Sequence, residues 1–176
     1  MKRILLLCAL TTLGTTVFAD HDKVVGKPTP GIRNLQVVES KVACAGAITP
    51  ETVPSIKEMG FVSIINLRRA EEQGARLEEE SAAATAAGLN YFHIPFNSRD
   101  PDPAAVDKFI AALGEPGREP AFIHCAGGSR AASMWYAKRV IQDGLDRDHA
   151  LEEARELGLG SERLESFMNG YIDNHL

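Results

Sequence analysis

The chain has 176 residues, of which 44% are hydrophobic and 24% are charged, and its formal net charge is −5 at pH 7. This length provides for one domain with a substantial core. The acidic charge argues against a nucleic-acid partner, because proteins that bind nucleic acid carry a basic surface. Three cysteines are too few for a disulfide scaffold, and the histidines show no metal-ligand spacing, so we expect neither a metal nor another cofactor.

The first 19 residues follow the pattern of a secretory signal peptide. Lys2 and Arg3 form a basic start, residues 4–10 are apolar, and Val17-Phe18-Ala19 resembles a cleavage site. Cleavage after Ala19 would remove two basic residues and no acids, so the formal net charge would move from −5 to −7. We expect a periplasmic or secreted protein without a membrane span after cleavage.

Residues 20–33 are rich in proline and glycine and contain few apolar side chains. This composition predicts a flexible leader, which places the folded domain at residues 34–176. The oligomeric state is left open by the sequence.

Beyond the leader, strand patterns alternate with helix patterns. We expect strands at 35–38, 41–45, 61–67, 91–94 and 121–124, and helices at 49–59, 76–87, 102–113, 130–141, 150–157 and 164–172. Such alternation predicts an α/β fold with a mostly parallel central sheet, helices on both faces and an all-helical C-terminal part.

The segment around Cys125 combines a strand, a glycine-rich loop and a helix start. Backbone N–H groups of such a loop, with the positive end of the next helix, converge on one point and favour an anion there. A cysteine at that point is favoured as a nucleophilic thiolate. The planar guanidinium of Arg130 can hold two oxygens of a tetrahedral anion above the sulfur.

Other polar residues are expected at the same edge of the sheet. Arg68, the loop 95–103 and Cys125 each follow the carboxyl end of a strand, where open α/β sheets bind ligands. Arg68 and Glu71 could also form a supporting pair. The residues expected to bind the substrate are His124, Ala126, Gly127, Gly128, Ser129 and Arg68.

Three segments together carry a family resemblance. Ile64-Ile65-Asn66-Leu67-Arg68, Tyr91-Phe92-His93-Ile94-Pro95 and the run from His124-Cys125 to Arg130 resemble the cysteine-dependent protein tyrosine and dual-specificity phosphatases. The similarity is closer to the bacterial beta-lactamase hydrolase-like, phosphatase-like family, some of whose members are labelled sulfur transferases. The resemblance implies that Cys125 takes the phosphoryl group from a phosphorylated protein or small phosphate ester, and that Arg130 clamps its oxygens.

The resemblance also requires an acid that protonates the leaving group. Asp100 and Asp102 are the candidates on the neighbouring loop. Asp102 precedes Pro103 and is suited to cap a helix, so we favour Asp100.

Two features depart from the phosphatase pattern and leave alternatives open. Four residues separate Cys125 from Arg130, where these phosphatases have five, and Ala131 stands where they carry a hydroxyl residue. Both changes predict slow turnover. Rhodanese-like sulfurtransferases share the shorter spacing, which makes a Cys125 persulfide the main alternative. A third possibility is a non-catalytic anion-binding or redox module in which Cys125 pairs with Cys44.

Overall fold

The computed structural model describes residues 23–38 and 41–176, so the expected signal peptide lies outside it. Within the described residues, six strands form one sheet in the order β1-β2-β3-β6-β4-β5. They are β1 (Val24–Gly26), β2 (Gln36–Val38), β3 (Val42–Ala45), β4 (Ser63–Asn66), β5 (Asn90–His93) and β6 (Ala121–His124). The pairs β3–β6, β6–β4 and β4–β5 are parallel. The pairs β1–β2 and β2–β3 are antiparallel, which adds two antiparallel strands at one edge of the sheet.

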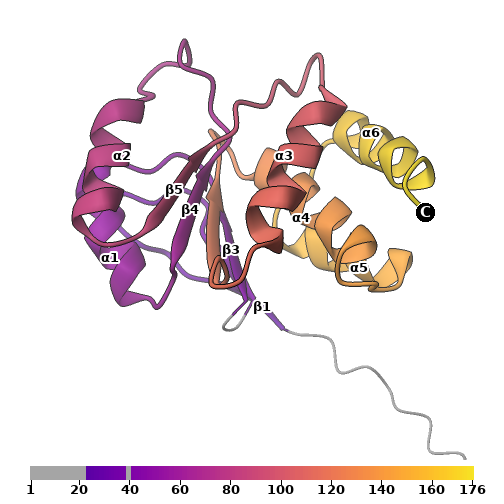
Figure 1. Ribbon diagram of the computed structural model, residues 1–176, viewed down its shortest axis with the longest axis horizontal. Helices are drawn as coiled ribbons and strands as arrows, with labels where there is room; N and C mark the ends of the chain where they lie inside the picture. The colour runs from indigo at the N-terminus through magenta and orange to yellow at the C-terminus, as the bar shows by residue number, and fades with distance from the viewer. Residues whose placement is uncertain (1–22, 39–40) are drawn as a thin grey trace, which may run out of the picture.

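Helices cover both faces of this sheet, as the alternating pattern predicts (Figure 1). They are the 3₁₀ helix η1 (Pro50–Thr52), α1 (Val53–Glu58), α2 (Leu77–Ala86), α3 (Pro103–Gly114), α4 (Ser129–Ile141), α5 (Arg147–Glu156) and α6 (Glu162–Asp173). In Figure 1, α1 and α2 lie on one side of the sheet, and α3 to α6 lie on the other. No helix of the described part is long and apolar enough to cross a membrane.

The central strands are buried along their whole length. Every residue of β3, β4 and β6 is buried, which is characteristic of parallel strands covered on both faces. Because β4, β5 and β6 run parallel, their carboxyl ends lie at one edge. That edge presents the loops that follow Asn66, His93 and His124.

The sequence analysis predicted a flexible leader at residues 20–33, but residues 24–33 belong to the folded domain. Val24–Gly26 forms an antiparallel pair with β2, and the Lys27 N–H donates to the Leu35 carbonyl at 3.0 Å. Ile32 is buried in the core. Val24 and Val25 supply β propensity that the nearby prolines and glycines obscure. The prolines and glycines therefore form turns within the domain.

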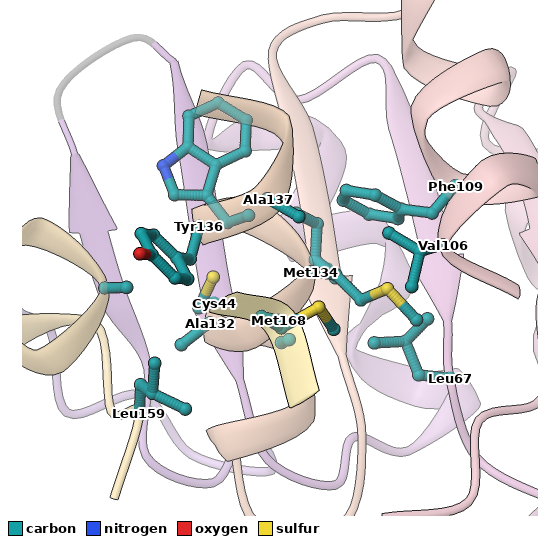
Figure 2. Close-up of a cluster of buried hydrophobic side chains, with 14 of the residues drawn as sticks. Cys44, Leu67, Val106, Phe109, Ala132, Met134, Tyr136, Ala137, Leu159 and Met168 are labelled. Carbon is teal, nitrogen blue, oxygen red and sulfur yellow. The ribbon is translucent and has the colours of Figure 1, made fainter. Parts of the chain in front are cut away.

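The larger core lies between the sheet and helices α3 to α6, where Figure 2 shows Leu67, Val106, Phe109, Met134 and Met168 packed together. Each large apolar side chain buried in this way contributes about 1.5–3 kcal/mol. Cys44 and Cys125 belong to the same cluster. The nucleophile candidate therefore stands where this core meets the carboxyl edge of the sheet.

Candidate active site

Cys125 stands between the end of β6 and the first turn of α4. Its N–H donates to the Ala45 carbonyl at 3.1 Å, which continues the pairing of β6 with β3. The Gly128 N–H donates to the Cys125 Sγ at 3.1 Å. Gly128 has a φ of +112°, a conformation in which a side chain would be strained. The glycine thus lets the loop turn an amide toward the sulfur.

The end of β3 braces this loop from the other side. The Ala47 N–H donates to the Ala126 carbonyl at 3.1 Å, and Asn34 Nδ2 donates to the Gly127 carbonyl at 3.0 Å. Gly46 is required at this contact, because a Cβ there would stand 3.0 Å from the Ala126 oxygen. Two loop carbonyls are therefore held by neighbours outside the loop.

Several backbone N–H groups of this loop make no hydrogen bond within the described part of the chain. The N–H groups of Ala126, Gly127, Ser129 and Arg130 have no hydrogen-bond acceptor among the described residues. The first N–H groups of a helix have no partner inside it, and they carry the positive end of its dipole. This arrangement supports the expected anion cradle. Ser129 is the first residue of α4, and its Oγ accepts from the Gly160 N–H at 3.2 Å.

Arg130 is held by a bidentate pair with Glu72. Its Nη1 and Nη2 donate to Glu72 Oε1 and Oε2 at 2.6 and 2.8 Å. Nη1 also contacts the carbonyls of Leu67 at 3.1 Å and Phe96 at 2.8 Å. These contacts fix the guanidinium plane between the loops that follow β4 and β5.

The hydrogen bonds leave one edge of the guanidinium available. Arginine has five N–H donors, of which two are on Nη1, two on Nη2 and one on Nε. The contacts to Glu72, Leu67 and Phe96 occupy both Nη1 hydrogens and one Nη2 hydrogen. The Nε–H and the second Nη2–H remain for the sulfur and for a bound anion.

The two charges of this pair stabilise each other. Burial would raise the pKa of Glu72, but hydrogen bonds from Arg130 and the Arg69 N–H, with the charges of Arg130 and Arg68, lower it to about 2. Burial would lower the pKa of Arg130, whereas Glu72 and the nearby Cys125 raise it. Both groups are therefore charged at neutral pH.

Arg68 was expected to bind substrate, but it is not among the residues that line the cavity at Cys125. Its side chain is buried and donates to the carbonyls of Gly74 at 2.9 Å and Gln73 at 2.6 Å. Its Nε lies 3.6 Å from a Glu72 oxygen. The expected partner Glu71 pairs instead with Arg69. Arg68 therefore shapes the loop that presents Glu72, because the chain folds back onto its guanidinium.

The His124 side chain also lies away from the pocket, although it was expected to bind substrate. Side chains alternate between the faces of a strand, so His124 and Cys125 point in opposite directions. His124 Nε2 and Glu80 Oε1 are 2.8 Å apart, and both residues are buried. Asn66 Nδ2 donates to the same Glu80 oxygen at 3.0 Å, while Asn66 Oδ1 accepts from the Arg68 N–H at 2.8 Å. This network connects α2 to the loop after β4.

A cavity of about 420 Å³ opens above Cys125. It is lined by Arg69, Glu72, Asn97, Ser98, Arg99, Cys125, Ala126, Gly127, Ser129, Arg130, Ser161 and Leu164. The sequence interpretation missed Arg69, Glu72, Arg99 and the start of α6. Their spacing gives no local signal, because they come from loops that only the folded sheet brings together.

The two candidate acids lie in different settings. Asp102 accepts from the Ala104 N–H at 2.9 Å and caps α3, as expected. Asp100 is exposed in the turn before that helix and is not part of the cavity lining. Its role as the proton donor stays a prediction.

Cys44 and Cys125 are both free thiols. Cys44 is opposite Ile123 in the register of β3 and β6, so the two cysteines are offset by two residues. Diagonal neighbours in a sheet are about 7–8 Å apart, beyond the usual Cα separation in a disulfide. Burial, then the nearby Cys125, raises the pKa of Cys44 well above its ordinary value. The expected pairing of these cysteines is therefore not supported. Across the described residues, no cluster of His, Cys, Asp or Glu is placed to hold a metal ion.

Sequence comparison matches residues 34–141 to the family described as beta-lactamase hydrolase-like protein, phosphatase-like domain. The chain belongs to this family. A beta-lactamase hydrolase-like protein of Agrobacterium fabrum is 30% identical over 112 residues, which are 62% of this chain and 26% of that protein. The chain thus spans little more than a quarter of the length of the curated relatives it matches.

Solved structures share the fold of the chain. A putative phosphatase of Shewanella putrefaciens superposes with a TM-score of 0.69 at 21% identity, covering 82% of this chain and 95% of that one. TpbA of P. aeruginosa gives a TM-score of 0.64 at 20% identity, with 85% and 91% covered. Another TpbA structure is a complex with pTyr. These comparisons confirm the expected resemblance and fold class.

Proposed function

We propose that the chain is a cysteine-dependent phosphatase that hydrolyses phosphate monoesters through a phosphocysteine intermediate. The observation that carries the proposal is the arrangement at the base of the cavity. There the Gly128 N–H contacts the Cys125 sulfur, and Arg130 is fixed beside it by Glu72. Family membership and the pTyr complex of TpbA support the same reaction class.

In the first step the Cys125 thiolate attacks phosphorus, so that a sulfur–phosphorus bond forms as the ester oxygen–phosphorus bond breaks. Charge on the transferred group is spread over three equatorial oxygens. In this proposal the loop amides and the available edge of Arg130 stabilise these oxygens. Asp100 would supply a proton to the leaving oxygen. Water then attacks the phosphocysteine, which releases phosphate and restores the thiolate.

Slow turnover is part of the proposal. The loop from Cys125 to Arg130 has one residue fewer than the phosphatase pattern, and the buried Ala131 offers no hydroxyl to assist departure of the sulfur. We also propose that the chain is exported after cleavage behind Ala19. The intact mass of the secreted chain tests this, because a mature protein should begin at Asp20.

The activity test uses p-nitrophenyl phosphate with the wild type, Cys125→Ser and the matched control Cys44→Ala. Cys125→Ser should lose activity by on the order of 10⁴-fold or more, because loss of the nucleophile removes the covalent path. Cys44→Ala should retain most activity, since Cys44 does not line the cavity. Acid quenching of the wild type should trap one phosphoryl group on Cys125.

The spacing between Cys125 and Arg130 keeps a sulfurtransferase as the second candidate. In that reaction the Cys125 thiolate would take the outer sulfur of thiosulfate and release sulfite, and cyanide would then remove this sulfur as thiocyanate and restore the thiolate. Persulfide formation without phosphate release would reject the phosphatase proposal.

A further inference from the structure

The cavity above Cys125 is positively charged although the chain is acidic. Three arginines line it (Arg69, Arg99 and Arg130), and the carboxylate among its lining residues belongs to Glu72. Glu72 forms a bidentate pair with Arg130, and its Oε1 also accepts from the Arg69 N–H at 3.0 Å. Arg69 and Arg99 therefore add positive charge to the cavity beyond the Glu72–Arg130 pair, in a chain whose formal net charge is −5.

The backbone of Arg99 is held by hydrogen bonds, whereas its guanidinium has no hydrogen-bond or ion-pair partner among the described residues. Its N–H donates to Asn97 Oδ1 at 3.1 Å, and its carbonyl accepts from Arg163 Nη1 at 3.3 Å. These contacts place the residue at the cavity wall formed by the loop after β5. An arginine held in this way is suited to a ligand with several acceptor oxygens.

Arg69 comes from the loop after β4. Its Nε lies 3.7 Å from Glu72 Oε1, and its Nη1 lies 2.9 Å from Glu71 Oε1. The Glu71 side chain is 66% exposed. Exposed ion pairs of this kind contribute about 0–1 kcal/mol, so an incoming phosphate can compete for the guanidinium. Arg69 and Arg99 thus belong to different loops and line the same cavity.

The size of the cavity favours a small molecule. Its volume of about 420 Å³ lies in the range of small-ligand sites. Ser161 and Leu164, from the start of α6, form part of its lining, and Asn97 and Ser98 add polar groups beside Arg99. A compact ligand can reach Cys125 and both outer arginines together.

We propose that the substrate is a small molecule that carries a second phosphate next to the scissile one, and that Arg99 and Arg69 recognise this second phosphate. The inference rests on the proposed phosphatase function and names the substrate class of that site. The scissile phosphate occupies the cradle of Cys125 and Arg130, while the second phosphate binds between the two outer arginines.

A matched pair of substrates tests the proposal. 3-Phosphoglycerate and 2,3-bisphosphoglycerate differ by one phosphate on an adjacent carbon, and inorganic pyrophosphate tests an anhydride-linked second phosphate. The wild type should show a kcat/KM for a doubly phosphorylated compound at least about tenfold above that for 3-phosphoglycerate, because charge-assisted contacts to phosphate are strong. Which doubly phosphorylated compound is preferred distinguishes a vicinal bisphosphate from a diphosphate.

The arginine variants assign the preference to residues. Arg99→Gln and Arg69→Gln should each reduce this ratio of kcat/KM values by about tenfold. The control is Arg118→Gln, because Arg118 donates to Asn90 Oδ1 at the amino end of β5, the opposite edge of the sheet. Arg118→Gln should keep the wild-type ratio. A ratio near one in the wild type, or one unchanged in both outer-arginine variants, would overturn the proposal.

Binding to Cys125→Ser by calorimetry separates this inference from the proposed activity. The variant should bind 2,3-bisphosphoglycerate or pyrophosphate about tenfold more tightly than 3-phosphoglycerate or phosphate, and the difference should shrink with salt. If the wild type fails to hydrolyse p-nitrophenyl phosphate while this selectivity holds, the phosphatase function fails and the second-phosphate site stands. A phosphotyrosine peptide with acidic flanks that outperforms both doubly phosphorylated compounds would overturn the proposal in favour of a protein substrate.

Discussion

Two loops meet at Arg130, and they are built by different means. The loop after β6 is ordered through its backbone, because the Gly128 N–H donates to the Cys125 sulfur and the Ala126 and Gly127 carbonyls accept from Ala47 and Asn34. The loop after β4 is ordered by side chains, because Arg68 binds two carbonyls of its own loop and Glu72 reaches across to Arg130. The first loop carries Cys125 and leads into Arg130, and the second holds the Arg130 side chain in place.

This difference separates chemistry from positioning. A backbone-built loop needs glycines and a short spacing, which leave a mark in the sequence. A loop that is ordered by side chains needs a carboxylate at one position in space. Several local sequences can place a carboxylate there, so the sequence carries no clear signal of it. The following variants test whether the second loop is as necessary as the first.

The largest expected effect in this comparison comes from Arg130, where both loops act. Arg130→Ala should lower kcat/KM for p-nitrophenyl phosphate by on the order of 10² to 10³, because it removes a positioned donor to the developing charge. Arg130→Lys keeps the charge but lacks the planar fork, so it should recover only a small part. Recovery of full activity in Arg130→Lys would show that charge alone is sufficient.

Glu80 tests the support beneath the loop after β4. Glu80→Ala removes the buried acceptor of His124 Nε2 and one of the two acceptors of Asn66 Nδ2, which keeps Tyr91 Oη at 3.1 Å. A buried group left unsatisfied costs about 1–3 kcal/mol. Urea unfolding should show a loss of at least that size, and Glu80→Gln, which keeps an acceptor oxygen, should lose less. Equal losses in both variants would indicate that the charge rather than the hydrogen bonding matters.

Glu72 should make the free energy of unfolding depend on pH. Its pKa is lowered from 4.5 to about 2 in the folded protein, so the folded state favours the charged carboxylate. The resulting stabilisation is fully present above the unfolded value of 4.5 and is lost as the pH falls from 4.5 through 2. The free energy of unfolding of the wild type should therefore exceed that of Glu72→Gln at neutral pH, and the gap should close toward pH 2.

Glu72→Gln should also reduce kcat/KM at neutral pH by about tenfold, since Arg130 loses its charged partner but keeps the carbonyls of Leu67 and Phe96. Glu71→Gln is the matched control, because Glu71 is exposed and pairs with Arg69. Equal kcat/KM values for Glu72→Gln and Glu71→Gln would show that Glu72 does not position Arg130.

The smallest effects are expected at the two aspartates before α3. Asp102→Ala should cost about 1 kcal/mol of stability through loss of the helix cap, with little change in turnover. Asp100→Asn should leave stability nearly unchanged and should slow alkyl phosphates more than aryl phosphates, because poor leaving groups need the proton. Identical losses for both substrate types would exclude Asp100 as the acid.

The fold was largely predictable because its elements are local. Periodicity and helix-start signals such as Asp102-Pro103 place most strands and helices within a few residues of their observed positions. The edge strand β1 was missed, since three residues between turn formers carry little pattern. It is fixed by pairing with β2, which is a tertiary contact.

Within the candidate site, the sequence predicted the loop that runs from Cys125 to Arg130. Cys125 and Arg130 follow from the loop motif, whereas the positions of Glu72 and Arg99 depend on how separate loops meet. His124 was placed beside the substrate by its proximity to Cys125 in the chain. The alternation of side chains along β6 directs it instead to Glu80 on the opposite face.

The confinement of Arg130 has an entropic consequence for ligand binding. A free arginine side chain loses about 2 kcal/mol of rotamer entropy when it is ordered. In this chain Glu72 and the carbonyls of Leu67 and Phe96 order it during folding. An anion that enters the cavity therefore meets a donor edge that is already immobile, and its affinity is not reduced by freezing that side chain.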